Sequence, residues 1–158
     1  MIIWRIAAET RAYAAHDLSG GGAAARPGRW NDEKQALVYA ATSIALAVLE
    51  TAAHMDDAGL PLNRFLVRIK VPDAVWAARE EFDAASLPAS WAAIPAGKAS
   101  VRTGSRWIAS LRCAIALVPS VIVPEEQVAL INPAHADARK LRASVVRPFD
   151  YNRLFRPG

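Results

Sequence analysis

Residues 20–50 read GGGAAARPGRWNDEKQALVYAATSIALAVLE and decide how the rest of the chain is arranged. The stretch opens on three glycines, and glycine costs helix stability while it permits backbone conformations that other residues avoid. We therefore expect a loop as far as Gly28, a short strand over 37–40 and a helix over about 43–54. An arginine, a tyrosine and a glutamate come from these three elements. Because the elements follow one another closely, we expect the three side chains to lie close together.

The acid at Glu50 is the unusual feature of the predicted helix over 43–54, which is otherwise nearly all apolar. A helix that is apolar all round is expected to be buried on most faces. An ionised carboxylate is rarely buried without a partner, because its desolvation is costly. Glu50 must therefore pair with a cation, project into solvent or line a cleft. With Arg29 in the preceding loop, the segment favours a site for an anionic nucleotide, and a plain salt bridge or exposed helix face is the alternative.

Composition indicates one soluble domain over residues 1–158, with 53% hydrophobic residues and a formal net charge of +4. The positive charge gathers near the C-terminus, where Asp150 is the single acid over 139–156. A basic tail of this kind suits nucleic acid, a phosphate ligand or an acidic partner, and a solvated surface is the plain alternative. The basic residues of the tail are Arg139, Lys140, Arg142, Arg147, Arg153 and Arg156.

Several classes of site are excluded by the motifs. The single cysteine, Cys113, lies in an apolar segment and is expected to be a core residue, which fits a reducing compartment. The three histidines have no metal-ligand spacing, no Gly-x-x-x-x-Gly-Lys phosphate loop is present, and Ser120 lacks the frame of a hydrolase elbow. The N-terminus does not read as a signal peptide, and no stretch is long and apolar enough to span a membrane. We expect a cytoplasmic protein without a metal or resident cofactor.

Strands and helices alternate along the chain without a regular β-α-β order, which predicts an α+β fold with a mixed sheet core and flanking helices. The clearest strand is 64–71, where apolar residues alternate with Arg68 and Lys70. We expect further strands over 2–7, 114–118 (resuming at 121–123), 128–131 and an extended 145–155, short helices over 10–18, 74–82, 103–113 and 134–142, and irregular chain over 23–27 and 86–98.

Five short motifs in order resemble the RES domain family. They are Gly28-Arg29-Trp30-Asn31, Val38-Tyr39-Ala40, Leu46-Ala47-Val48-Leu49-Glu50, Val118-Pro119-Ser120 and Ile131-Asn132-Pro133. The family is named for an arginine, a glutamate and a serine, which match Arg29, Glu50 and Ser120. The resemblance extends over almost the whole chain. The chain departs from the family pattern at two places. Residues 32–36 lack the glycine that the family often has there, and Asn152 replaces the usual aspartate. Only the second departure affects an interaction, because asparagine cannot form a salt bridge at that position.

This resemblance implies a fold related to ADP-ribosyltransferases and a toxin of a bacterial toxin–antitoxin pair. It implies an activity that degrades NAD by breaking the nicotinamide–ribose bond and passing ADP-ribose to water or phosphate. One alternative is a mono-ADP-ribosyltransferase that modifies a cellular protein. Another, of a different class, is a basic nucleic-acid-binding module without catalysis.

The resemblance also assigns roles to the site residues, with NAD as substrate. Glu50 stabilises the cation that develops on the ribose, and Arg29 holds the pyrophosphate or the adjacent ribose. Tyr39 stacks on the nicotinamide or an adjacent ring. Ser120 orients the ribose or the nicotinamide.

Two further residues are weaker candidates for binding substrate. Arg5 is a possible second phosphate contact within the first strand. Asn31 is mainly expected to bond its own loop and is also included among the substrate-binding candidates.

The expected partner is an Xre-like helix-turn-helix antitoxin in a hetero-oligomer, with DNA reached only through that antitoxin and no membrane contact.

Overall fold

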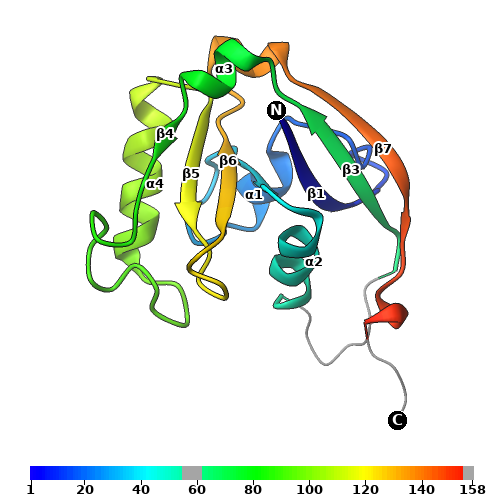
Figure 1. The fold of residues 1–158 in the computed structure, drawn as a ribbon, viewed down its shortest axis with the longest axis horizontal. Coiled ribbons are helices and arrows are strands. Elements are labelled where there is room, and N and C mark those ends of the chain that lie inside the picture. Colours follow the sequence, from blue (N-terminus) through cyan, green and yellow to red (C-terminus); the bar gives the residue numbers. More distant parts are fainter. Residues whose placement is uncertain (55–61, 155–158) are drawn as a thin grey trace.

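Seven strands form one mixed sheet in the order β4-β5-β6-β2-β1-β3-β7 (Figure 1). The computed structural model describes residues 1–54 and 62–154. Neighbouring strands pair antiparallel except β4 and β5, which are parallel. The strands are β1 (Ile2–Ala8), β2 (Val38–Ala41), β3 (Arg64–Lys70), β4 (Glu80–Glu81), β5 (Ile115–Pro119), β6 (Gln127–Ile131) and β7 (Arg142–Phe149).

Helices flank this sheet, so the predicted α+β fold is confirmed. Figure 1 shows α4 beside the β4–β5 end of the sheet and α2 between β6 and the strands β1, β3 and β7 at the other end. The α-helices are α1 (Gly21–Ala25), α2 (Ile44–Ala52), α3 (Asp73–Ala77) and α4 (Lys98–Ser110), and the 3-10 helices are η1 (Ala136–Lys140) and η2 (Tyr151–Arg153).

Both faces of the sheet carry apolar side chains, because successive residues of a strand point to opposite sides. On one face, Ile3, Val67 and Ile69 belong to a core cluster that packs against the chain around Ala15. On the other face, residues such as Leu66 belong to a second cluster that includes side chains of α2 and α4. The second face is the one that carries the candidate site.

Helix α2 begins where a serine caps it, since Ser43 Oγ accepts a hydrogen bond from the backbone N–H of Leu46 at 3.1 Å. Its predicted burial on most faces is wrong. Only Leu46 and Ala47 of this helix are buried, whereas Ile44 and Leu49 are exposed. The helix touches the sheet along one stripe only, so its opposite stripe stays in contact with solvent.

Several predicted elements differ from the structure. Residues 10–18 form turns in place of a helix, and 121–123 form a turn in place of a strand. The chain expected to be a loop contains α1, a five-residue helix that follows Gly20 in the left-handed conformation (φ 74°). Helix α4 begins at Lys98, before the expected start at residue 103.

Differences at the C-terminal end are smaller. The expected helix over 134–142 is the shorter 3-10 helix η1. The chain leaves the extended conformation at η2, where Asp150 Oδ1 accepts the backbone N–H of Asn152. Residue 155 of the expected extended segment lies outside the described residues.

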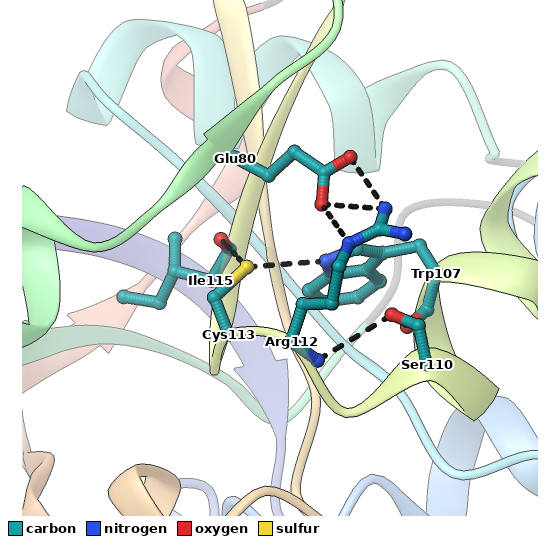
Figure 2. A network of polar contacts seen from close by, with 6 residues as sticks. All are labelled: Glu80, Trp107, Ser110, Arg112, Cys113 and Ile115. Atoms are coloured by element: carbon teal, nitrogen blue, oxygen red, sulfur yellow. Dashed lines mark hydrogen bonds and ion pairs between the residues drawn. The ribbon is translucent and has the colours of Figure 1, made fainter.

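A polar network joins the end of α4 to β4 and β5 (Figure 2). Arg112 donates from Nη2 to Glu80 Oε1 at 2.7 Å, and it also bonds the second carboxylate oxygen. The indole Nε1 of Trp107 donates to Cys113 Sγ at 3.4 Å, and the thiol donates to the carbonyl of Ile115 at 3.2 Å. Cys113 is buried, so its prediction as a core residue is confirmed.

Candidate active site

The acid of α2 and the serine after β5 meet in one hydrogen bond. Ser120 Oγ donates to Glu50 Oε1 at 2.6 Å. Ser120 Oγ also accepts hydrogen bonds from the backbone N–H groups of Ile122 and Val123, each at 3.1 Å. A hydroxyl offers one donor and two acceptor positions, so all three are occupied. The two amides therefore direct the single hydroxyl hydrogen of this buried serine toward the carboxylate.

The turn that carries Ser120 is also attached to the start of α2. Ser43 Oγ donates to Glu126 Oε2 at 3.1 Å, and Thr42 Oγ1 donates to the carbonyl of Gln127 at 3.2 Å. The β5–β6 turn thus bonds α2 near its N-terminus and again at Glu50. This double attachment fixes the position of the turn along the helix.

Arg29 reaches this site from the loop after α1. Its Nη1 donates to the carbonyls of Trp91 at 2.7 Å and Ala93 at 2.9 Å. Burial lowers the pKa of Arg29, and the nearby Glu50 and Tyr39 act in the opposite direction. Arginine stays protonated throughout the accessible pH range, so the guanidinium is a permanent cation near the Glu50 carboxylate.

Tyr39 supports the backbone on either side of Arg29. Its hydroxyl accepts the N–H of Trp30 at 3.0 Å and donates to Asn31 Oδ1 at 2.8 Å. Gly28 leaves the space for it, since a Cβ at that position would lie 2.6 Å from the Tyr39 hydroxyl. Burial raises the pKa of Tyr39 well above its ordinary value. The hydroxyl thus remains protonated, and its hydrogen bonds hold the loop that carries Arg29.

Asn31 is fully buried, and its hydrogen bonds attach its loop to α1 and to β2. Its Nδ2 donates to the carbonyls of Ala23 and Gln35 at 2.9 and 3.0 Å and to that of Asp32 at 3.1 Å. Its Oδ1 accepts the N–H of Gly28 and the Tyr39 hydroxyl. The expected loop-bonding role agrees with this geometry. A direct substrate contact does not, because both polar atoms are already occupied.

Arg5 does not join the other candidates. It lies on β1 between Ile3 and Ala7, which belong to the core on the opposite face of the sheet from α2. Its Nη1 donates to the carbonyl of Asp17 at 3.2 Å. Burial lowers the pKa of Arg5, and Asp17 partly offsets that effect. The predicted second phosphate contact is wrong here because the sheet separates this guanidinium from Glu50.

Three contributors to the site were not predicted. The carbonyls of Trp91 and Ala93 hold Arg29, and a backbone carbonyl carries no sequence signature. Trp91 stacks on Trp30 with ring centroids 6.2 Å apart, which brings the irregular chain before α4 against the arginine loop. Gly104 lets α4 approach so closely that a Cβ there would lie 1.8 Å from the carbonyl oxygen of Trp30. A glycine within a predicted helix is the only signal that the sequence offered.

Metal binding finds no support among residues 1–54 and 62–154, where no three His, Cys, Asp or Glu side chains are grouped to hold an ion. In the same part of the chain, no helix has the length and apolar character needed to cross a membrane.

The model of the RES domain matches residues 2–153. The chain belongs to the RES domain family. A toxin of Sphingobium sp. named "Prs ADP-ribosylating toxin" is 54% identical over 149 residues, which cover 94% of this chain and 92% of that protein. "Toxin Res" of Pseudomonas putida is 36% identical over 160 residues, covering 98% and 100%. "Toxin Res" of Yersinia enterocolitica is 33% identical over 145 residues, covering 92% of each.

The fold also resembles a chain of a solved toxin–antitoxin complex. A chain from the crystal structure of the M. tuberculosis MbcT–MbcA toxin–antitoxin complex superposes with a TM-score of 0.60 at 18% identity, covering 93% of this chain and 84% of that chain. At this identity the likeness shows the fold alone. The predicted resemblance to RES domain toxins is confirmed.

Proposed function

We propose that this RES domain toxin cleaves the nicotinamide–ribose bond of NAD and transfers the ADP-ribose to an acceptor. The observation that carries the proposal is the carboxylate of Glu50, oriented by Ser120 and lying near the Arg29 guanidinium. A fixed carboxylate beside a permanent cation suits a substrate with a sugar that becomes positive and a pyrophosphate that is negative.

Glu50 acts on the ribose. The bond from the anomeric carbon to the nicotinamide nitrogen breaks, its electron pair stays on that nitrogen, and neutral nicotinamide leaves. The ribose passes through an oxocarbenium-like state, which the Glu50 carboxylate stabilises. Because nicotinamide in NAD is already cationic, its departure requires no general acid. One carboxylate is therefore sufficient.

Arg29 binds the pyrophosphate. Its Nη1 donates to two carbonyls, which fix the plane of the guanidinium, and the proposal assigns the other donors of the guanidinium to the pyrophosphate. Tyr39 contributes by holding the loop, and its ring remains the candidate for stacking on the substrate.

The first candidate for the acceptor of ADP-ribose is a protein, because the relative at 54% identity is named for ADP-ribosylation of Prs. Water or phosphate, the acceptor implied by the sequence resemblance, is the second candidate. The chemistry at Glu50 is the same in both cases, since the acceptor attacks the anomeric carbon after nicotinamide has left.

The test uses the purified chain with NAD labelled in the adenosine moiety, incubated alone, with phosphate, or with purified Prs. Protein ADP-ribosylation predicts label on Prs and little free ADP-ribose. Hydrolysis or phosphorolysis predicts free ADP-ribose or its 1-phosphate without labelled protein. If no incubation releases nicotinamide, NAD is not the substrate.

We further propose that the protein acts in the cytoplasm and is neutralised by a helix-turn-helix antitoxin encoded beside it. Expression of the chain alone should stop growth, and co-expression of the adjacent reading frame should restore it. Growth arrest that the adjacent frame does not relieve would contradict this partner.

A further inference from the structure

A groove lies along the solvent-exposed stripe of α2, away from the candidate active site. It holds about 760 Å³ between that helix and the end of β7. The wall from α2 is apolar, and Leu49 on it is 38% exposed. The groove is lined by Ala45, Val48, Leu49, Ala52, Arg147, Pro148, Phe149, Asp150 and Leu154. An apolar helix stripe open to solvent is unusual for a free surface and typical of a protein interface.

Basic side chains continue this surface along β3 and β7. Arg68 and Lys70 are on the same face of β3 as Leu66, which belongs to the core cluster under α2. Across the strand pair, Arg142 lies opposite Lys70 and Arg147 lies opposite Leu66, so both are on that face too. We call Arg68, Lys70, Arg142 and Arg147 the basic wing. All four side chains are exposed.

The basic wing is not neutralised within the described chain. Among residues 1–54 and 62–154, none of its four cations belongs to an ion pair. Lys70 and Arg142 are direct cross-strand neighbours, and like charges in that position destabilise a sheet. Charges on an edge strand such as β7 do discourage aggregation, but charges of either sign achieve this. Four charges of one sign indicate an acidic ligand.

We propose that the groove and the basic wing together form the docking surface for the antitoxin, through a segment with apolar residues on one side and acidic residues on the other. The proposal rests on the antitoxin partner given under the proposed function. Arg147 belongs to both parts of the surface, so one segment can fill the groove and place its carboxylates along β3 and β7. A nucleic acid matches the basic wing but has no use for an apolar groove.

Docking on this surface is separate from the chemistry. Residues 45, 48, 49 and 52 form one stripe of α2. At 3.6 residues per turn, Glu50 projects about 150° around the helix from the centre of that stripe. A segment in the groove thus contacts the helix that carries the carboxylate without entering the site between Glu50, Ser120 and Arg29.

The experiment measures the affinity of the full-length antitoxin from the adjacent reading frame for the full chain, by calorimetry. Glu50→Gln is present in every sample to avoid toxicity. Leu49→Asp tests the groove and Arg68→Glu tests the basic wing. Leu111→Asp and Arg106→Glu, at exposed positions of the α4 region, are the matched controls. We expect at least about tenfold weaker binding for both test variants and less than about twofold change for the controls.

Added salt should weaken binding of the unsubstituted surface more than that of Arg68→Glu. Arg68→Glu gives a readout even if Leu49→Asp does not fold. Unchanged affinity for Arg68→Glu and for any folded Leu49→Asp overturns the proposal, as does an antitoxin that does not bind at all. Loss of duplex DNA binding by Arg68→Glu with unchanged antitoxin affinity overturns it in favour of nucleic acid.

Nicotinamide release is measured separately, with Arg68→Glu alone in a chain that retains Glu50. We expect release close to that of the unsubstituted chain. Absence of release from the unsubstituted chain would contradict the proposed chemistry and leave the docking result standing.

Discussion

At the scale of single residues, the bond between Ser120 and Glu50 is the most informative contact in the molecule. The resemblance assigned the serine to the ribose or the nicotinamide, whereas the structure places its hydroxyl hydrogen on the carboxylate at 2.6 Å. The two backbone amides that it accepts leave no free position on the oxygen. We therefore propose that Ser120 is a positioning residue for Glu50.

Ser120→Ala should lower kcat for nicotinamide release about tenfold and change KM little, because the carboxylate loses its orientation but substrate contacts remain. The variant should also lose about 1–3 kcal/mol of unfolding free energy, since two amides lose their acceptor. Steady-state kinetics and urea denaturation measure both effects, with Ser110→Ala as the control. A raised KM with unchanged kcat would mean that the serine contacts the substrate directly.

Tyr39→Phe tests whether the hydroxyl or the ring of this tyrosine matters. Removal of the hydroxyl leaves the Trp30 N–H without its acceptor and Asn31 Oδ1 with Gly28 N–H as its remaining donor, so we expect a loss of about 1–3 kcal/mol of unfolding free energy. KM for NAD should rise, because the loop that presents Arg29 is loosened. Tyr13→Phe, at an exposed tyrosine, is the control. If stability and KM stay unchanged, Tyr39 acts through its ring alone.

At the scale of elements, the site depends on how closely α4 approaches the arginine loop. Gly104 faces the Trp30 carbonyl with no room for a side chain, and Trp30 in turn stacks on Trp91. The chain before α4 then supplies the two carbonyls that hold Arg29. Displacement of α4 should therefore disturb the arginine as well as the core.

The same substitution should have opposite effects at two helical glycines. Gly104→Ala should reduce unfolding free energy by several kcal/mol and raise KM, because the added Cβ overlaps the Trp30 carbonyl. Gly22→Ala, in α1, meets nothing within 4 Å and should raise stability by up to about 1 kcal/mol. Thermal and urea unfolding of the two variants compare them directly. A stabilised Gly104→Ala would show that the close approach is not required.

Patterns local in sequence predicted the elements best. The alternation over 64–71 predicted β3 and its two faces, and the predicted helix over about 43–54 corresponds to α2. The association of Arg29, Tyr39 and Glu50 in one site stays a prediction that rests on their closeness in sequence. The side to which Arg5 points, and the exposure of Leu49, depend on which elements cover each face. The packing of elements against each face produces no pattern in the local sequence. The backbone carbonyls that hold Arg29 produce none either.

At the scale of the whole molecule, α2 separates two surfaces with different chemistry. One side presents Glu50 to the serine after β5, and the exposed stripe lines the apolar groove beside the basic wing. In the proposed function and docking, one short helix takes part both in catalysis and in partner binding. Docking on the exposed stripe would account for a helix that is more apolar than its own burial requires.

In the proposed function, Glu50 drives cleavage of the nicotinamide–ribose bond, and the decisive measurement is the release of nicotinamide from NAD by the purified chain. The measurement compares the unsubstituted protein with Glu50→Gln, which keeps the shape of the side chain and removes its charge, without acceptor, with phosphate and with Prs. We predict release by the unsubstituted chain with at least one acceptor and a loss of at least about 100-fold in Glu50→Gln, with unchanged circular dichroism. Equal rates for the two proteins would contradict the catalytic role of Glu50, and no release under any of the three conditions would contradict NAD as the substrate.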